Sequence, residues 1–227
     1  MKLNENKKFY MFPMQRKVLV KLMELSDIEN NFFLTGGTAL SVFYLNHRQS
    51  NDIDLFTTAK VDLSDIGFEL QRIWLNETIT LKENTNFLSL LIRNIKVDFV
   101  IDLLSIKENR QKYYFKNKHY VSVDTITNIA SNKLCAVVSR REIKDYLDLY
   151  FISKYFSDCN FETIYKNAKH KDAIFDDPAT VAFQMEEGIN FTKDNKKLFP
   201  EIFIKFNAGD FYAFYARFAK FLYHKLL

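Results

Sequence analysis

The stretch Asn51-Asp-Ile-Asp-Leu-Phe-Thr57 places two carboxylates, Asp52 and Asp54, one residue apart in a short apolar run. On a β-strand, residues i and i+2 point to the same face, so these carboxylates are expected side by side, with Ile53 and Leu55 buried opposite. Adjacent anions repel each other, and Mg²⁺, which takes one or two carboxylates together with phosphate oxygens and water, relieves that repulsion. A solvated strand end is the alternative interpretation, because the Asp-x-Asp pattern alone is weakly specific.

The preceding stretch, Phe32-Phe-Leu-Thr-Gly-Gly-Thr-Ala-Leu40, predicts an apolar strand that runs into Gly36-Gly37 and then a helix from Thr38 to Leu45. Two glycines allow the backbone to approach a ligand closely, and the free N–H groups at the start of a helix can hold a phosphate. The alternative is an ordinary tight turn between a strand and a helix.

A later apolar stretch also contains carboxylates, which solvation alone does not explain well. Residues 87–102 predict two strands joined by a tight turn near Arg93 and Asn94. The second strand, Ile95 to Ile101, carries Asp98 inside an apolar run, and Asp102 follows on the same face. The spacing alone leaves both Asp98 and Asp102 as candidates for a functional carboxylate.

Two helices are expected after residue 124. In the first, Lys133 lies close to an apolar stripe, where it either snorkels from the helix edge or reaches a cleft. In the second, Arg141, Asp145 and Asp148 are separated by four and three residues, so they share a face and can pair. The spacing alone favours a salt-bridge ladder on the surface.

The ordered set Gly-Gly-Thr-Ala-Leu followed by Arg48-x-Ser50-x-Asp52-x-Asp54-Leu-Phe resembles the first motif of the nucleotidyltransferase superfamily, in the form found in the AbiEii toxin-like nucleotidyltransferases. Arg141-x-x-Lys144-Asp145-x-x-Asp148-Leu149 resembles a later signature of that family. The resemblance covers roughly residues 30 to 150, and the terminal helical part only in general character.

The resemblance implies a role for each matching residue. Asp98 is preferred to Asp102 as the third acid, because Lys-Val-Asp-Phe is similar to the pattern of the family, and Asp102 is expected at a strand end or turn. Asp148 is preferred to Asp145 as the catalytic carboxylate, because Asp145 is better placed to pair with Arg141. The implied metal ligands for Mg²⁺ or Mn²⁺ are Asp52, Asp54 and Asp98, and the implied nucleotide-binding residues are Gly36, Gly37, Thr38, Arg48, Ser50, Lys133 and Asp145.

The activity implied by the resemblance is metal-dependent transfer of a nucleoside monophosphate from an NTP to an acceptor hydroxyl. A toxin that acts on the 3′ end of tRNA, with a cognate antitoxin as partner, is the expected biological role. A small-molecule or protein hydroxyl is the alternative acceptor. A non-catalytic module that binds nucleotide or RNA and a metal-dependent phosphodiesterase are the other function classes.

The length of 227 residues and the hydrophobic content of 48% suit one substantial core, or a core domain with a helical extension. The expected fold is α/β (α+β): a nucleotidyltransferase-like mixed sheet flanked by helices in residues 1–123, and a helical region in residues 124–227 that completes the active-site cleft. No apolar run is long enough to span a bilayer. The start of the chain lacks the apolar core of a signal peptide, and the chain has only two cysteines, so a cytoplasmic protein is expected.

The C-terminal segment is basic: from Gly188 to Leu227, seven lysine and arginine residues stand against three acidic ones, while the whole chain has a net charge of +4. The last helix is expected to bury an aromatic face and to present Arg217 and Lys220 on another. This polar face is either solvated or a surface for the RNA backbone.

Overall fold

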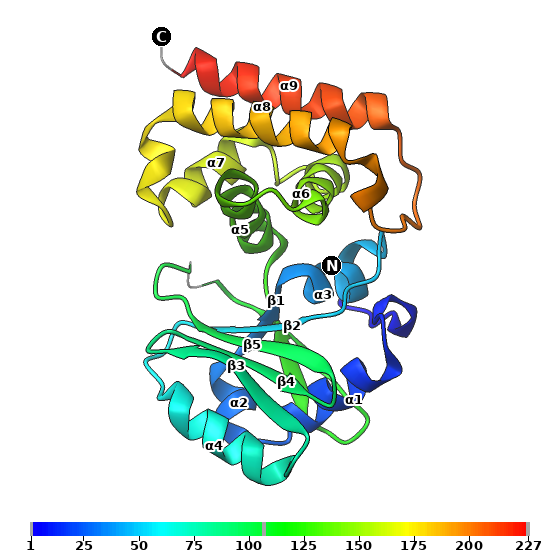
Figure 1. The fold of residues 1–227 in the computed structure, drawn as a ribbon, viewed down its shortest axis with the longest axis vertical. Helices are drawn as coiled ribbons and strands as arrows, with labels where there is room; N and C mark the ends of the chain where they lie inside the picture. The colour runs from blue at the N-terminus through cyan, green and yellow to red at the C-terminus, as the bar shows by residue number, and fades with distance from the viewer. Residues whose placement is uncertain (1, 106–107, 226–227) are drawn as a thin grey trace. The chain divides into compact units, whose positions relative to one another are not determined.

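The computed structural model describes residues 2–105 and 108–225, and the chain divides into two compact units, Met1–Thr125 and Ile126–Leu227 (Figure 1). The first unit contains a β-sheet with helices, and the second is helical. Across the two described stretches, no helix is both long and apolar enough to cross a membrane.

The first unit is built on a mixed sheet, as the sequence predicts. Its described part contains seven strands in the order β3-β4-β5-β2-β1-β7-β6, in which β2 runs parallel to β5, and β1 parallel to β7. The strands are β1 (Phe33–Thr35), β2 (Ile53–Thr57), β3 (Thr78–Asn84), β4 (Phe87–Ile92), β5 (Ile95–Ile101), β6 (Gln111–Tyr114) and β7 (Tyr120–Val123).

Helices cover the apolar face of this sheet. Figure 1 shows α1, α2 and α4 on one side of the strands. That face buries Ile53 and Leu55 of β2 beside Val97 and Phe99 of β5, all with no exposed surface. The helical elements of this unit are η1 (Lys7–Phe9), α1 (Pro13–Leu22), α2 (Ser26–Asn31), α3 (Gly36–Ala39), η2 (Leu40–Leu45) and α4 (Leu63–Ile73).

The second unit packs its helices around an aromatic core. Tyr146 of α6 donates a hydrogen bond to the Val137 carbonyl at 2.9 Å, and Tyr215 of α9 donates one to the Tyr146 carbonyl at 2.7 Å. Helices α8 and α9 run side by side (Figure 1). The elements are α5 (Ile126–Ser139), α6 (Ile143–Tyr155), α7 (Phe161–Lys169), η3 (Ala173–Asp176), α8 (Pro178–Asp194), η4 (Lys196–Leu198) and α9 (Ala208–His224).

The strands predicted within residues 32–35, 51–57 and 87–101 are present as β1, β2, β4 and β5. The turn between β4 and β5 has Arg93 and Asn94 at φ angles of 50° and 64°, the left-handed backbone of a two-residue hairpin turn. The helix expected from Thr38 to Leu45 instead begins at Gly36 and continues as the π-helical segment η2. Strands β6 and β7 were not predicted, because they are short and follow no apolar run.

Candidate active site

A row of polar side chains crosses four neighbouring strands of the first unit. The register pairs Thr35 of β1 with Asp54, Asp54 with Asp98 of β5, and Asp98 with Ser89 of β4. Residues paired in register project from the same face of a sheet. The two predicted carboxylates Asp54 and Asp98 are therefore direct neighbours, on the face opposite Leu55 and its apolar partners.

Asp98 is held by two donors. The Ser89 hydroxyl donates to Asp98 Oδ1 at 2.6 Å, and the Lys96 ammonium lies 2.6 Å from Asp98 Oδ2. Burial alone lowers the pKa of Lys96, but the hydrogen bond to Asp98 and the charges of Asp98, Asp52 and Asp54 outweigh it and raise that pKa. One ammonium therefore lies within the electrostatic reach of all three predicted metal ligands.

The Gly36-Gly37 turn packs directly against this carboxylate row. Gly36 has a φ of +65°, and a Cβ there would overlap the carboxylate of Asp54. A Cβ at Gly37 would lie 2.8 Å from both Arg48 Nη2 and Ser50 Oγ. The two glycines are required for this close approach, and they bring together the residues that the sequence singles out for phosphate binding.

Asp52 and Thr38 are joined through the backbone. The Thr38 hydroxyl donates to the Asp52 carbonyl, and the buried side-chain amide of Gln15 donates both to that carbonyl and to Thr38 Oγ1, each at 3.0 Å. Because its hydroxyl is fully buried and bonded in this way, Thr38 fixes the position of the start of β2. The Asp52 side chain is only partly buried.

The second unit contains its own buried charge cluster. The Lys133 ammonium on α5 lies 2.7 Å from Asp145 Oδ1 and 2.7 Å from Asp148 Oδ2, both on α6. The two carboxylate side chains have no exposed surface, and that of Lys133 is 8% exposed. Asp145 and Asp148 thus form a buried cluster, and the surface ladder suggested by their spacing is wrong.

Asp145 pairs with Arg140, and the expected pairing with Arg141 is wrong. Arg140 Nε donates to Asp145 Oδ2 at 2.8 Å. Arg141 is exposed in the connection before α6, which begins at Ile143, so it does not lie on the helix face of Asp145. Burial raises the pKa of Asp145, but the Lys133 charge and the Arg140 hydrogen bond and charge outweigh it, so the pKa is lowered from its usual value.

The remaining predicted residues lie outside these clusters. Asp102 lies just beyond the end of β5, where its Oδ1 accepts a hydrogen bond from the Leu104 N–H at 3.2 Å, as expected of a turn residue. Arg217 and Lys220 are exposed on α9. The opposite face of α9 is buried as predicted, through Phe211, Phe214, Tyr215, Phe218 and Leu222.

The donor set suits a hard divalent cation in its chemistry. Asp54 and Asp98 supply carboxylate oxygens from paired positions, and Mg²⁺ binds through one or two carboxylates when phosphate and water fill the other positions. Among residues 2–105 and 108–225, however, three or more potential ligands never form a ready-made metal-binding group. The residues therefore fit a metal that arrives with the phosphates of a substrate, and in the structure the Lys96 ammonium pairs with Asp98.

Sequence reasoning assigned no role to Gln15, Lys96 and Arg140. Lys96 could have been found, because it stands two residues before Asp98 on the same strand face. Gln15 gave no signal, since its partners are distant in sequence and one of them is a backbone carbonyl. The pairing of Arg140 with Asp145 could not be predicted, because no residue around Arg140 signals the end of α5.

Comparison with known proteins places these features in a family. The sequence profile of the nucleotidyl transferase AbiEii toxin family, of type IV toxin–antitoxin systems, matches residues 17–221. An uncharacterised protein of Aquifex aeolicus, aq_aa25, is 31% identical over 140 residues, which is 62% of this chain. The match covers 66% of the length of that relative.

Two solved structures share the fold. JHP933 from Helicobacter pylori superposes with a TM-score of 0.52 at 16% identity, over 98% of this chain and 95% of its own. MenT4, a nucleotidyltransferase toxin of Mycobacterium tuberculosis H37Rv, gives a TM-score of 0.57 at 12% identity, over 92% of this chain and 82% of its own. With the profile covering most of the sequence, the chain belongs to the AbiEii family of nucleotidyltransferase toxins.

Proposed function

We propose that this protein transfers a nucleoside monophosphate from an NTP to the hydroxyl at the 3′ end of an RNA, with tRNA as the favoured acceptor. The observation that carries the proposal is the juxtaposition of the Asp54–Asp98 register pair with the Gly36-Gly37 turn. Phosphoryl and nucleotidyl transfer depend chiefly on positioning the reacting groups and on neutralising charge. The turn admits the close backbone approach that positions a phosphate, and the carboxylate pair would hold the cation that neutralises its charge.

On this proposal, Asp54 and Asp98 hold Mg²⁺ or Mn²⁺, with Asp52 joining them through its partly buried carboxylate. When bound, such a metal would neutralise phosphate charge and favour the nucleophilic form of the acceptor hydroxyl. The residues of the chain bind and orient the NTP: Arg48 and Ser50 lie against Gly37 and would contact the triphosphate. Thr38 and Gln15 keep the Asp52 backbone in place.

Lys133 is proposed to contact the triphosphate, with Asp145 in the nucleotide-binding set and Asp148 as the catalytic carboxylate. In the structure, the Lys133 ammonium forms ion pairs with both of these carboxylates. To hold a phosphate, Lys133 would have to exchange one carboxylate partner for a phosphate oxygen. Release of Asp148 in this exchange would allow its carboxylate to accept a proton from an acceptor hydroxyl.

The activity can be tested with purified protein, each radiolabelled NTP in turn, Mg²⁺ and total RNA. Labelled RNA is the expected product, and the Asp52→Asn/Asp54→Asn variant should lose both this product and Mn²⁺ binding in a titration. The stability of this variant without metal should equal or exceed that of the wild type, because two repelling carboxylates are removed. A large loss of metal-free stability would instead assign the carboxylates a structural role.

Asp102→Asn is the matched control, because Asp102 was the rival candidate for the third metal ligand. Its asparagine oxygen can still accept from the Leu104 N–H, so the turn should persist. Normal Mn²⁺ affinity in this variant, with weakened affinity in Asp98→Asn, would support Asp98 as the ligand. The reverse result would overturn that assignment.

The proposed RNA acceptor is supported by exposed positive charge on α9. Replacing Arg217 and Lys220 by glutamine should weaken RNA binding and reduce the log–log salt slope by about 0.7 for each phosphate of a single strand that the variant no longer neutralises. The NTP affinity should not change. If RNA binding and RNA labelling match the wild type at every salt concentration, the charged face of α9 is only solvated, and the acceptor binds elsewhere.

A further inference from the structure

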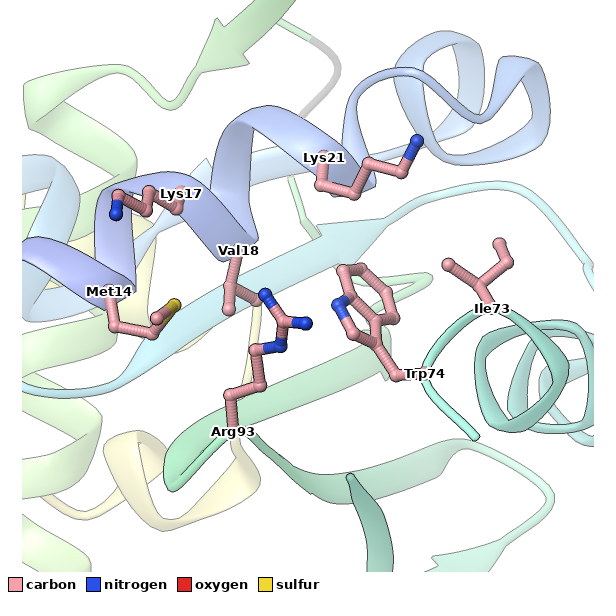
Figure 2. A pocket seen from close by; sticks show the side chains of 7 residues that line it. All are labelled: Met14, Lys17, Val18, Lys21, Ile73, Trp74 and Arg93. Atoms are coloured by element: carbon pink, nitrogen blue, oxygen red, sulfur yellow. The ribbon is translucent and has the colours of Figure 1, made fainter. Parts of the chain in front are cut away.

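A cavity of about 300 Å³ lies in the first unit, between α1, the end of α4 and the β4–β5 turn (Figure 2). Its lining includes Lys17 and Lys21 from α1, Arg93 from the turn, and the indole ring of Trp74. Met14, Val18 and Ile73 provide the apolar part of the wall. None of these residues belongs to the carboxylate row or to the Gly36-Gly37 turn.

The polar groups of this cavity are all donors. Lys17, Lys21 and Arg93 carry ammonium or guanidinium groups, and Trp74 offers an indole N–H that cannot accept. Figure 2 shows the indole nitrogen turned toward the Arg93 guanidinium, so two donors face each other. A ligand that satisfies them must present acceptors.

The Trp74 N–H is available to such a ligand. The side chain is largely buried, with 4% of the residue exposed, and within residues 2–105 and 108–225 no acceptor bonds to its indole nitrogen. The nitrogen itself retains contact with the cavity, so an acceptor that enters there can bond to it.

The charges around the cavity indicate a ligand with one negative charge. Lys21 pairs with Glu24 at 2.7 Å and Arg93 with Glu77 at 2.8 Å, so these two cations are already neutralised. Lys17 is exposed and has no ion pair within the described part of the chain. A net charge of +1 matches a phosphodiester better than a phosphate dianion.

We propose that this cavity binds a backbone phosphodiester of the RNA acceptor, with the adjoining ribose against Met14, Val18 and the indole ring. The volume suits a group of nucleotide size, and the positive net charge of the chain favours a polyanionic partner. This inference rests on the proposed RNA acceptor, and it adds a binding position on α1. The same helix carries Gln15, whose amide binds the Asp52 carbonyl beside the carboxylate row.

Trp74 is the sole tryptophan of the chain, so its fluorescence reports directly on the cavity. We expect a saturable fluorescence change on titration with a short single-stranded RNA. Inorganic phosphate and a nucleoside monophosphate should produce little change at matched phosphate concentrations. An equal response to either would assign the cavity to free phosphate, and a response to an acidic peptide instead of RNA would assign it to a protein ligand. Both results overturn the proposal.

Lys17→Gln is the decisive variant, because Lys17 is exposed and its replacement should not disturb folding. Its RNA affinity, measured by anisotropy of labelled RNA, should fall, and its log–log salt slope should drop by about 0.7, the value for one phosphate of a single strand. Trp74→Phe keeps the aromatic ring but removes the N–H, and it should bind labelled RNA more weakly. Lys116→Gln, an exposed lysine in the β6–β7 turn, is the matched control and should leave both quantities unchanged.

The outcomes separate this inference from the proposed function. If RNA is labelled with nucleotide while Trp74 fluorescence stays constant and Lys17→Gln binds RNA normally, the cavity proposal is wrong and the activity stands. If Trp74 responds to RNA but no NTP is incorporated, the cavity binds RNA and the proposed activity is wrong. Absence of RNA binding by anisotropy overturns the cavity proposal outright.

Discussion

Replacing Lys133 by methionine should destabilise the second unit whether or not Lys133 binds nucleotide. Methionine keeps the length and apolar stem of the side chain but removes the ammonium that lies 2.7 Å from carboxylate oxygens of both Asp145 and Asp148. The two carboxylate side chains have no exposed surface, so water cannot compensate for the missing cation.

The magnitude follows from the remaining interactions. Removing one partner of a buried ion pair typically costs about 3–5 kcal/mol, because the other charge is left in a poorly solvated site. Arg140 still donates to Asp145 at 2.8 Å, so the loss of stability should fall near 3 kcal/mol. Urea denaturation followed by circular dichroism at neutral pH measures this free energy of unfolding.

The pH dependence provides a second measurement. In the wild type, the lowered pKa of Asp145 means that this carboxylate stabilises the fold above its unfolded pKa of about 3.9, and that the contribution disappears as the pH falls through the folded value. In Lys133→Met, the pKa of a buried carboxylate should rise instead. The deficit relative to the wild type should therefore shrink as the pH is lowered from 7 to 5.

The double variant Lys133→Met/Asp148→Asn is the control, because it removes one of the two opposed charges together with the ammonium. It should recover part of the stability that Lys133→Met loses. If Lys133→Met unfolds within about 0.5 kcal/mol of the wild type at neutral pH, the cluster does not have the buried, paired character inferred from its geometry.

Three further results are expected. In an Asp54→Ala background, Gly36→Ala should reduce the free energy of unfolding by about 1 kcal/mol, the cost of an alanine at a φ of +65°. In the wild type the reduction should be clearly larger, because the new Cβ meets the Asp54 carboxylate. Equal reductions in this double-mutant cycle would contradict the close approach. Lys96→Met should tighten Mn²⁺ binding about two- to fivefold, the factor expected for a partly exposed ion pair, because the ammonium no longer competes for Asp98. An unchanged Mn²⁺ affinity in calorimetry would exclude this competition. Thr38→Val should reduce the free energy of unfolding by about 1–3 kcal/mol, because the Gln15 amide and the Asp52 carbonyl each lose a buried partner. A reduction smaller than about 0.5 kcal/mol would show that these two groups find other hydrogen-bond partners.

The acids of the first unit could be found from the sequence because a strand has a period of two. Asp52 and Asp54 interrupt an apolar run at that period, and Asp98 does the same in β5. Their alignment could not be predicted, because the register of Asp54 with Asp98 is set by parallel pairing between distant segments. The pairing of Lys96 with Asp98 follows from their spacing, but its proximity to Asp52 and Asp54 depended on that register, since these two acids come from another segment.

The second unit shows where local periodicity is insufficient. The spacing of Arg141, Asp145 and Asp148 assumes that the second helix already includes Arg141, but α5 ends at Ser139 and α6 begins only at Ile143. No glycine or proline marks this break, so the sequence lacked the usual signal for a helix end. The break places Arg140, instead of Arg141, against Asp145, and it allows Lys133 of one helix to lie between two carboxylates of the next.

In each unit a lysine pairs with acids of the candidate site. Lys96 compensates Asp98 in the sheet, and Lys133 compensates Asp145 and Asp148 among the helices. On the proposed function, substrate binding would be an exchange of partners: a metal would replace the Lys96 ammonium beside Asp98, and a phosphate would replace a carboxylate at Lys133. Such an exchange releases the Lys96 ammonium in the first unit and one carboxylate in the second, so the cost of breaking the existing ion pairs offsets part of the binding free energy.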